Sequence, residues 1–237
     1  MKILAIDTSS KNCSVAIVEA NKNQFNIINL KNNDDERTHS QKLMPMIQQI
    51  FNESSLKLDD INLIACCVGP GSFTGIRIGV STAKAFTDAK NIPVVGITSL
   101  ESLAYNISNN GYIIPIIDAK NNNAYSALYL HDNKYTLNNE NIADNIDIIL
   151  DKFVSKINNN IKDIYFIGDG ATLYKNLLEE KFSDFNIHFS SDNTQSSISL
   201  AKCAYDKYLL GIYGDSNFIS PIYLRKSQAE RNANGQK

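Results

Sequence analysis

The sequence predicts a two-lobed α/β fold, because one order of strand and helix patterns occurs twice along its 237 residues. Each half begins with three strand-like segments and continues with alternating helices and strands, so both halves follow the order βββαβαβα. Parallel strands in one sheet need right-handed helical crossovers between them. Each half is therefore expected to form a mixed sheet flanked by helices.

The first half contains five strand patterns and three helix patterns. The strands are predicted at 2–8, 13–20, 25–30, 63–68 and 94–98, and the helices at 40–51, 74–89 and 99–107. Pro45 predicts that the first helix begins late or is kinked there. The wholly apolar run 63–68 is typical of a central strand that is buried on both faces. Cys66 and Cys67 within it are expected to be buried and to point to opposite faces.

The second half repeats this order with weaker patterns. Its strands are predicted at 112–118, 125–131, 134–137, 164–168 and 187–190, and its helices at 146–157, 171–182 and 198–210. Residues 1–108 are thus the predicted N-terminal lobe and 109–212 the C-terminal lobe. Residues 213–237 are expected to be a tail that is packed at first and then flexible. Two such lobes facing each other across a cleft form the architecture of actin, Hsp70 and the sugar kinases.

Composition and charge narrow the class of protein. Hydrophobic residues make up 43% and charged residues 20% of the chain, as in ordinary globular proteins. The formal charge of −2 provides no overall cationic field for a nucleic acid. No apolar run approaches the roughly 18 residues that a membrane span needs. The four cysteines lack metal-ligand spacing, so we expect a cytoplasmic protein with reduced thiols.

Each half places an aspartate at the end of its first strand, at Asp7 and Asp118. A carboxylate at this position can hold Mg²⁺ through water, and the hydroxyls and N–H groups beside it can hold phosphate. Neither turn contains the glycine that would let the backbone approach a phosphate closely. The alternative is that both aspartates cap their own turns. The candidate remnants of a phosphate loop are Asp7, Thr8, Ser9, Gly69, Gly71, Ser72 and Thr74.

The glycine-rich stretch 68–79 links the buried strand to the second helix. It is neither a Walker A loop nor a dinucleotide fingerprint. Ser72 or Thr74 is expected to cap the helix. Gly75, Gly79 and Ala83 recur every four residues and form a smooth helix face, against which a second helix could pack closely. The residues alone leave open whether this face packs within its own lobe or contacts another molecule.

The chain offers no constellation for catalysis or for metal binding. His39, His131 and His188 are far apart, and position 43, one helical turn after His39, is leucine. A two-histidine metal site on that helix is therefore excluded. Ser72 follows Gly71, but no base can be identified for it as a nucleophile. We accordingly expect no catalytic residue, no metal site and no cofactor bound by this chain alone.

Several motifs resemble the TsaB family, formerly YeaZ, of bacterial proteins of tRNA threonylcarbamoyladenosine biosynthesis. They are MKILAIDTSSKNCSVAIV at 1–18, HSQKLMP at 39–45, GPGSFTGIRIGVSTAK at 69–84, ITSL at 97–100 and PIYLR at 221–225. The resemblance is strong over residues 1–105. It thins from 106 to 215, where it depends on the repeated fold plan.

This resemblance implies a paralogue of the catalytic subunit TsaD, which carries a His-x-x-x-His metal site and transfers threonylcarbamoyl to adenosine 37 of certain tRNAs. It implies that this chain is a non-catalytic subunit that binds and activates TsaD and forms a homodimer when alone. The ATPase TsaE would join the pair, tRNA would bind through the complex, and the complex would use ATP and Mg²⁺.

The resemblance also implies that helices 40–51 and 74–89 contact TsaD. The candidate interface residues are Leu43, Ile47, Ile50, Gly75, Ile76, Gly79, Val80 and Ala83. A bulky side chain at Gly79 is then expected to weaken TsaD binding without unfolding the chain. The basic stretch 225–237 is expected to be a frayed tail and not a tRNA contact.

Three alternatives remain. One is an ATP-dependent phosphotransferase of the same fold, which the glycine-poor turns argue against. Another is an inactive metalloprotease-like homodimer, for which the sequence supplies no metal ligands. The last is a self-associating scaffold without a role in tRNA modification.

Overall fold

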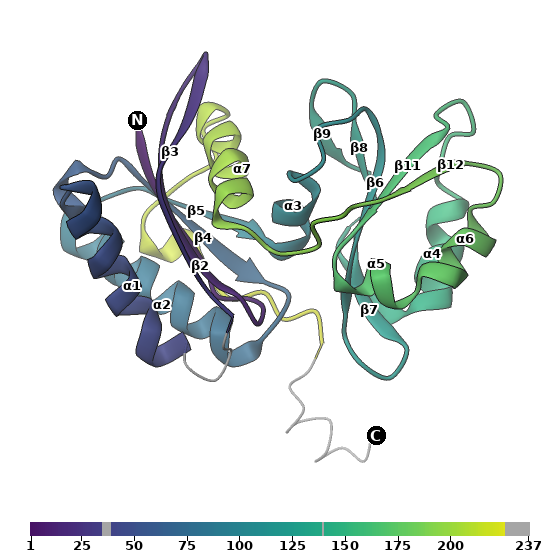
Figure 1. Cartoon of the computed structure of the whole chain (residues 1–237), viewed down its shortest axis with the longest axis horizontal. Helices are drawn as coiled ribbons and strands as arrows, with labels where there is room; N and C mark the ends of the chain where they lie inside the picture. Colours follow the sequence, from purple (N-terminus) through teal and green to yellow (C-terminus); the bar gives the residue numbers. More distant parts are fainter. Residues whose placement is uncertain (35–38, 139, 226–237) are drawn as a thin grey trace.

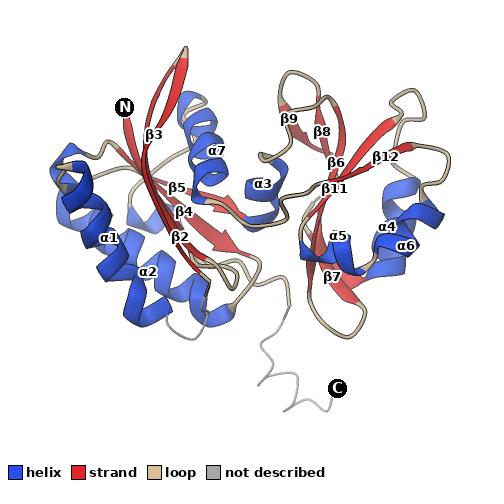
Figure 2. Cartoon of the chain, viewed as in Figure 1, coloured by secondary structure: helices blue, strands red, loops and turns tan. Residues whose placement is uncertain are grey.

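The computed structural model of the protein describes residues 1–34, 39–138 and 140–225. It confirms the predicted two-lobed α/β fold (Figure 1). The first lobe is built around a five-stranded sheet, and the second around a sheet of seven strands. Figure 2 shows the helices grouped on the faces of these two sheets.

The first sheet has the strand order β3-β2-β1-β4-β5. Its strands are β1 (Lys2–Asp7), β2 (Cys13–Asn21), β3 (Gln24–Asn33), β4 (Leu63–Gly69) and β5 (Val94–Thr98). The first three form an antiparallel meander, whereas β4 runs parallel to both β1 and β5. Helices α1 (His39–Ser54) and α2 (Phe73–Lys90) are the crossovers and cover one face of this sheet (Figure 1). A short 3-10 helix, η2 (Leu58–Asp60), precedes β4.

Strand β4 is buried along its whole length, as its apolar sequence predicts. Cys66 packs in the core under α1 and α2, and Cys67 packs in the core on the opposite face. The predicted alternation of the two side chains is therefore confirmed. All four cysteines are buried and free, and burial raises the pKa of the Cys13 thiol to about 12.

The first helix runs from His39 to Ser54 with Pro45 inside it, so it does not begin late. The third helix, α3 (Ser99–Ala104), ends sooner than the predicted residue 107. Helix α3 lies between the lobes, and Leu100 and Leu103 pack against Ile113 and Ile167 of the second sheet.

The second sheet departs further from the prediction. Its path is β10-β7-β6-β11-β12, with β8 paired to both β6 and β9. The strands are β6 (Gly111–Asp118), β7 (Asn123–Ser126), β8 (Tyr129–His131), β9 (Tyr135–Leu137), β10 (Ile142–Asn145), β11 (Asp163–Ile167) and β12 (Asn186–Phe189). The predicted strand 125–131 is thus two strands that pair with different parts of β6, and β10 was not predicted.

The outer face of the second sheet is covered by three helices. These are α4 (Ile146–Val154), α5 (Asp169–Leu173) and α6 (Lys175–Lys181). Phe153, Ala171 and Leu178, one from each helix, lie in a single core cluster with the sheet. The predicted helix 171–182 is in fact two helices that meet at Tyr174.

The last long helix, α7 (Ser197–Leu209), belongs to the first lobe in space. The repeat predicted it within the second half, at 198–210. Leu200, Ala201 and Ala204 instead pack on the face of the first sheet opposite α1 and α2 (Figure 1). Helix α7 packs there because this face of the first sheet is apolar and is buried only when a helix covers it.

The chain then continues along the first lobe. Gly214 exchanges two backbone hydrogen bonds with Val94, and Ile219 is buried under α2 after the 3-10 helix η3 (Ser216–Phe218). The predicted tail 213–237 therefore contacts the first lobe at Gly214, Ile219 and Ile222, and its last residues, 226–237, lie outside the described residues. None of the helices within the described ranges is both long and apolar enough to cross a membrane.

Candidate functional site at the glycine-rich loop and the outer helices

Asp7 ends β1 and closes the turn that leads to β2. Its Oδ1 atom accepts hydrogen bonds from the backbone N–H of Ser9 (2.9 Å) and from the Ser9 hydroxyl (2.7 Å). The Asp7 side chain is completely buried. This geometry matches the turn-capping alternative for Asp7, because the carboxylate is used to hold its own turn.

Burial also sets the electrostatics of Asp7. Its Oδ2 atom has no hydrogen-bond partner within the described residues. Burial is the largest influence on this carboxyl and raises its pKa, while the two bonds from Ser9, and also Cys67 and His39, act in the opposite direction. Because Asp7 is completely buried, its carboxylate presents no oxygen to a solvated ion.

The glycine-rich loop packs directly on this turn. The Ser72 N–H donates to the carbonyl oxygen of Ser9 (2.7 Å), and the Thr8 hydroxyl donates to the carbonyl oxygen of Gly75 (2.7 Å). A Cβ atom at Gly71 would overlap the Ser9 carbonyl oxygen, and one at Gly75 would overlap that of Thr8. The two glycines therefore allow the start of α2 to approach the β1–β2 turn. The backbone of residues 71–75 occupies the space next to Thr8 and Ser9.

Two backbone N–H groups in the first turn of α2 donate hydrogen bonds to Ser72. Ser72 caps the helix, as predicted, because its Oγ atom accepts from the Gly75 N–H (3.3 Å). The Ile76 N–H donates to the Ser72 carbonyl oxygen (2.9 Å). The candidate phosphate-loop residues are thus brought together, and Thr8, Ser9 and Ser72 use their hydrogen bonds within the turn, the loop and the start of α2.

The candidate interface residues lie inside the first lobe. All eight are buried: Leu43, Ile47, Ile50, Gly75, Ile76, Gly79, Val80 and Ala83. A Cβ atom at Gly79 would overlap the Thr8 hydroxyl, so a bulky side chain there would disturb the fold itself. The smooth helix face therefore packs within its own lobe, and the earlier expectation for a Gly79 substitution is corrected. A side chain in the core cannot contact a partner without opening that core.

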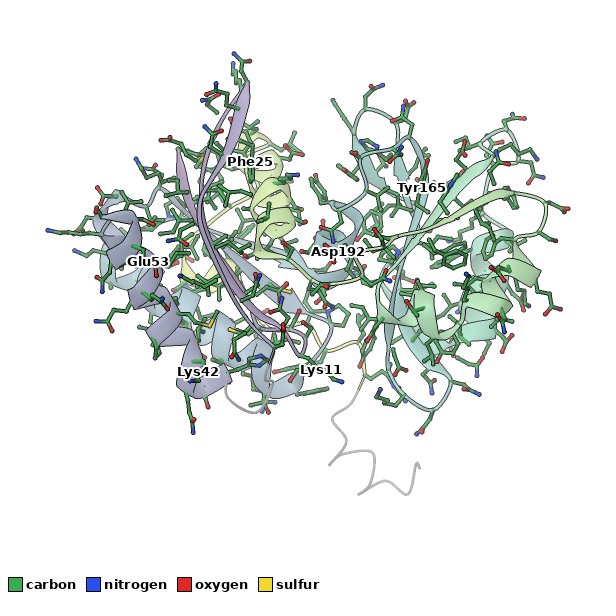
Figure 3. All side chains as sticks on the ribbon, in the orientation of Figure 1. Lys11, Phe25, Lys42, Glu53, Tyr165 and Asp192 are labelled. Carbon is green, nitrogen blue, oxygen red and sulfur yellow. The ribbon has the colours of Figure 1, made fainter. Side chains whose placement is uncertain are left out.

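The outer faces of α1 and α2 carry different residues. The exposed positions of α1 include Lys42, Met44, Gln48 and Glu53, and those of α2 include Arg77, Ser81, Ala85 and Ala89. Lys42 and Glu53 lie at opposite ends of α1 (Figure 3). These residues are the positions between the periodic apolar ones that the resemblance assigned to the interface.

The second lobe has a related turn at Asp118. Its Oδ1 atom accepts from the Lys120 N–H (2.8 Å), and its Oδ2 atom pairs with the Lys120 ammonium (2.5 Å). This pairing raises the pKa of Lys120. The Asp118 N–H donates to Asp169 at the start of α5 (3.0 Å). Asp118 thus caps its turn as well, but Lys120 is largely exposed to solvent.

The histidines are dispersed, as the sequence predicts. His39 is buried at the start of α1 with its Nε2 atom 3.1 Å from the Lys11 carbonyl oxygen, while His131 and His188 lie on strands of the second lobe. Within residues 1–34, 39–138 and 140–225, no group of three His, Cys, Asp or Glu side chains could hold a metal ion.

Comparisons with known proteins agree with the family resemblance of the sequence motifs at 1–18, 39–45, 69–84, 97–100 and 221–225. Residues 31–233 match the family described as TsaD, tRNA N6-adenosine threonylcarbamoyltransferase. The chain is 31% identical to the TsaB protein of Buchnera aphidicola subsp. Schizaphis graminum over 78% of its own length and 86% of that protein. It is 29% identical to Bacillus subtilis TsaB over 97% of its length and 96% of that protein. The chain belongs to the TsaB family.

Solved structures of TsaB-like proteins share the fold. YeaZ from Pseudomonas aeruginosa superposes with a TM-score of 0.76 at 21% identity, covering 94% of this chain and all of that one. A second P. aeruginosa structure, described as similar to peptidase YeaZ, gives 0.78 at 22% identity, with 94% and 99% covered. As a TsaB-family protein, the chain takes part in tRNA threonylcarbamoyladenosine biosynthesis.

Proposed function

We propose that this chain is a non-catalytic partner subunit of the complex that forms N6-threonylcarbamoyladenosine at position 37 of tRNA. In this role it binds the catalytic paralogue TsaD and holds it in an active conformation. The ATPase TsaE joins the pair, ATP and Mg²⁺ are used by the complex, and tRNA binds through the assembled complex. In the absence of TsaD the same surface supports a homodimer.

The observation that carries this proposal is the close packing of the glycine-rich loop on the β1–β2 turn. A phosphotransferase of this fold needs free N–H groups and an ionised carboxylate at that place. Here the Ser72 and Gly75 N–H groups are bonded within the chain, and Asp7 is completely buried. These groups stabilise the lobe, which favours a structural role over phosphoryl transfer.

The outer faces of α1 and α2 are the surface that we assign to TsaD. Ser81, Ala85 and Ala89 recur every four residues on the exposed side of α2 and form a ridge of small side chains. Met44, a large apolar side chain on α1, is 49% exposed. Small side chains allow another helix to approach closely, and interface centres are depleted of charge. The charged residues Lys42 and Glu53 lie toward the ends of α1 (Figure 3).

Co-purification with the same organism's TsaD tests this role. TsaD should be assayed for threonylcarbamoyladenosine formation with and without this chain, and the chain should be assayed alone for ATP turnover. We expect a stable pair, modification that depends on the chain, and no turnover by the chain alone.

The opposite results have clear meanings. ATP turnover by the purified chain would favour the phosphotransferase alternative. A stable homodimer that neither binds TsaD nor affects tRNA modification would favour the scaffold alternative. Metal analysis of the purified chain addresses the metalloprotease-like alternative, for which a stoichiometric bound metal is required.

A further inference from the structure

Residues 219–225, here called the C-terminal strap, pack along the start of α2. Ile219 is buried in the core beneath that helix, and the Ile222 N–H donates to the carbonyl oxygen of Val68 at the end of β4 (2.8 Å). Farther along, Arg225 donates to the Ala119 carbonyl oxygen of the second lobe (2.9 Å). The strap is therefore anchored on both sides of Tyr223.

Tyr223 forms an ordered cluster with two residues of α2. Its ring stacks on Phe73 with centroids 4.6 Å apart and an interplanar angle of 4°. Its hydroxyl oxygen accepts a hydrogen bond from Arg77 Nε (2.7 Å), and the guanidinium carbon lies 5.5 Å from the ring centroid. Stacking and the hydrogen bond together restrict the conformations that the Arg77 side chain can adopt.

The charge of Arg77 is not neutralised by the chain in its described residues. Arg77 is exposed, and no ion pair that the chain forms within 1–34, 39–138 and 140–225 includes it. Its Nε atom is held by Tyr223, so the terminal nitrogens remain to bind outward. An arginine fixed in this way loses little conformational entropy when it binds a carboxylate, and its planar fork suits two parallel hydrogen bonds.

Arg77 also lies on the surface assigned to the partner. It is one turn before Ser81 on α2 and therefore begins the exposed ridge of Ser81, Ala85 and Ala89. Arginine and tyrosine are enriched among the residues that contribute most to protein interfaces.

We propose that Arg77, held in place by Tyr223, is a preorganised contact for a carboxylate of the catalytic partner subunit. Tyr223 acts as a positioning residue, and the acidic side chain is supplied by the partner. The inference rests on the proposed function, because it assumes that the partner docks on the outer face of α2.

A double-mutant cycle on the affinity for TsaD tests the proposal. Arg77→Ala is expected to weaken binding about tenfold or more, since it removes a charge-assisted contact. Tyr223→Phe keeps the ring and its stacking but removes the hydroxyl that holds Arg77, and it should weaken binding several-fold. In the Arg77→Ala background, Tyr223→Phe should have almost no further effect, because the side chain that it positions is absent.

Tyr213 provides a matched control. It is 41% exposed, as Tyr223 is, and it stacks on Tyr208 with centroids 4.7 Å apart. Tyr213→Phe should leave the affinity for TsaD unchanged. Thermal unfolding of each variant, together with Arg77→Lys as a charge-retaining variant of intermediate affinity, separates loss of the contact from loss of the fold.

Three results would overturn the inference. If wild type binds TsaD and Arg77→Ala binds equally well, the contact is wrong while the proposed function stands. If wild type does not bind TsaD at all, the proposed function fails and this inference fails with it. If Arg77→Ala weakens only the binding of an isolated tRNA anticodon stem-loop, the cluster contacts RNA and not a protein carboxylate.

Discussion

The two strand-end aspartates make the same turn hydrogen bond and have different surroundings. In each lobe the Asp Oδ1 atom accepts the N–H of the residue two positions later, at Ser9 and at Lys120. In the first lobe the N-terminus of α2 then packs over the turn, and Asp7 is completely buried. In the second lobe Asp118 pairs with a lysine that is largely exposed to solvent.

The role of each strand-end aspartate in this protein therefore depends on how the next helix packs against its turn. That helix is α2, after β4, in the first lobe and α5, after β11, in the second. Glycines at 71 and 75 let α2 approach within hydrogen-bonding distance of the first turn. The resulting burial disfavours the charge of Asp7, whereas the ion pair favours the charge of Lys120. Four substitutions test this comparison of the lobes, beginning with the largest expected effect.

Leu200→Ala tests which lobe α7 stabilises. Leu200 is completely buried against the first sheet, so its truncation should lower the free energy of unfolding by about 3 kcal/mol. Hydrogen exchange should accelerate mainly in β1 and β4. Leu178→Ala, equally buried in the second lobe, is the matched control and should accelerate exchange around β11. Faster exchange mainly in the second lobe after Leu200→Ala would contradict the assignment of α7.

Gly75→Ala compares how closely the helix after the central strand packs against the first strand region in each lobe, at Thr8 in the first and at Ile116 in the second. The new methyl group would overlap a backbone oxygen of Thr8, so unfolding in urea should show a loss of about 3 kcal/mol. The second-lobe counterpart, Gly170→Ala, would bring a methyl group to 2.5 Å from the Ile116 Cγ2 atom. Ile116 is completely buried and its Cγ2 atom branches directly from Cβ, so it can shift only slightly. Because this overlap is smaller than the one with the Thr8 oxygen, the expected loss is about 2 kcal/mol. Equal losses would mean that both helices are packed with the same rigidity.

Asp7→Asn should change how stability depends on pH. Burial raises the pKa of Asp7 above its unfolded value, so its stabilising contribution is present at low pH and is lost as pH rises through the folded pKa. The stability of Asp7→Asn relative to wild type should therefore increase as the pH rises above about 4, the ordinary pKa of an aspartic acid. Urea denaturation at several pH values measures this difference. A difference that stays constant or moves the other way would show that Asp7 is ionised in the folded protein.

Lys120→Ala is expected to have the smallest effect. The Lys120 side chain is 82% exposed, and water screens its ion pair with Asp118. The loss in free energy of unfolding should be at most about 1 kcal/mol and should shrink further in high salt. A loss comparable to that of Gly75→Ala would mean that the second turn is as tightly coupled to its lobe as the first.

Much of the first lobe could be predicted from its sequence. Strands β1, β2 and β4 are largely apolar, and β4 begins and ends within one residue of the predicted segment 63–68. The second lobe was predicted less well, because its strands are short and a single apolar pattern covers two of them. Residues 125–131 read as one strand, yet the chain between β7 and β8 shifts from one part of β6 to another. Periodicity carries no information about such a change of pairing.

The candidate site shows the same limit. The sequence identified the glycine-rich stretch and offered Ser72 or Thr74 as the helix cap, and the structure shows Ser72 in that role beside the β1–β2 turn. It assigned the apolar residues of α1 and α2 to an interface, whereas the structure buries them. Arg77 and Tyr223 lay within recognised motifs, but their contact joins residues 146 positions apart. Nothing in either motif predicts that Arg77 and Tyr223 are in contact.

By itself the sequence determined the order of strands and helices in the first lobe, the membership in the TsaB family and the buried central strand, since these depend on local pattern and motif. Only the tertiary structure decided that α7 covers the first sheet, that Asp7 is sealed beneath α2 and that Tyr223 holds Arg77. These three depend on which apolar faces and polar atoms meet in space. Contacts between distant segments follow from the packing of the whole chain.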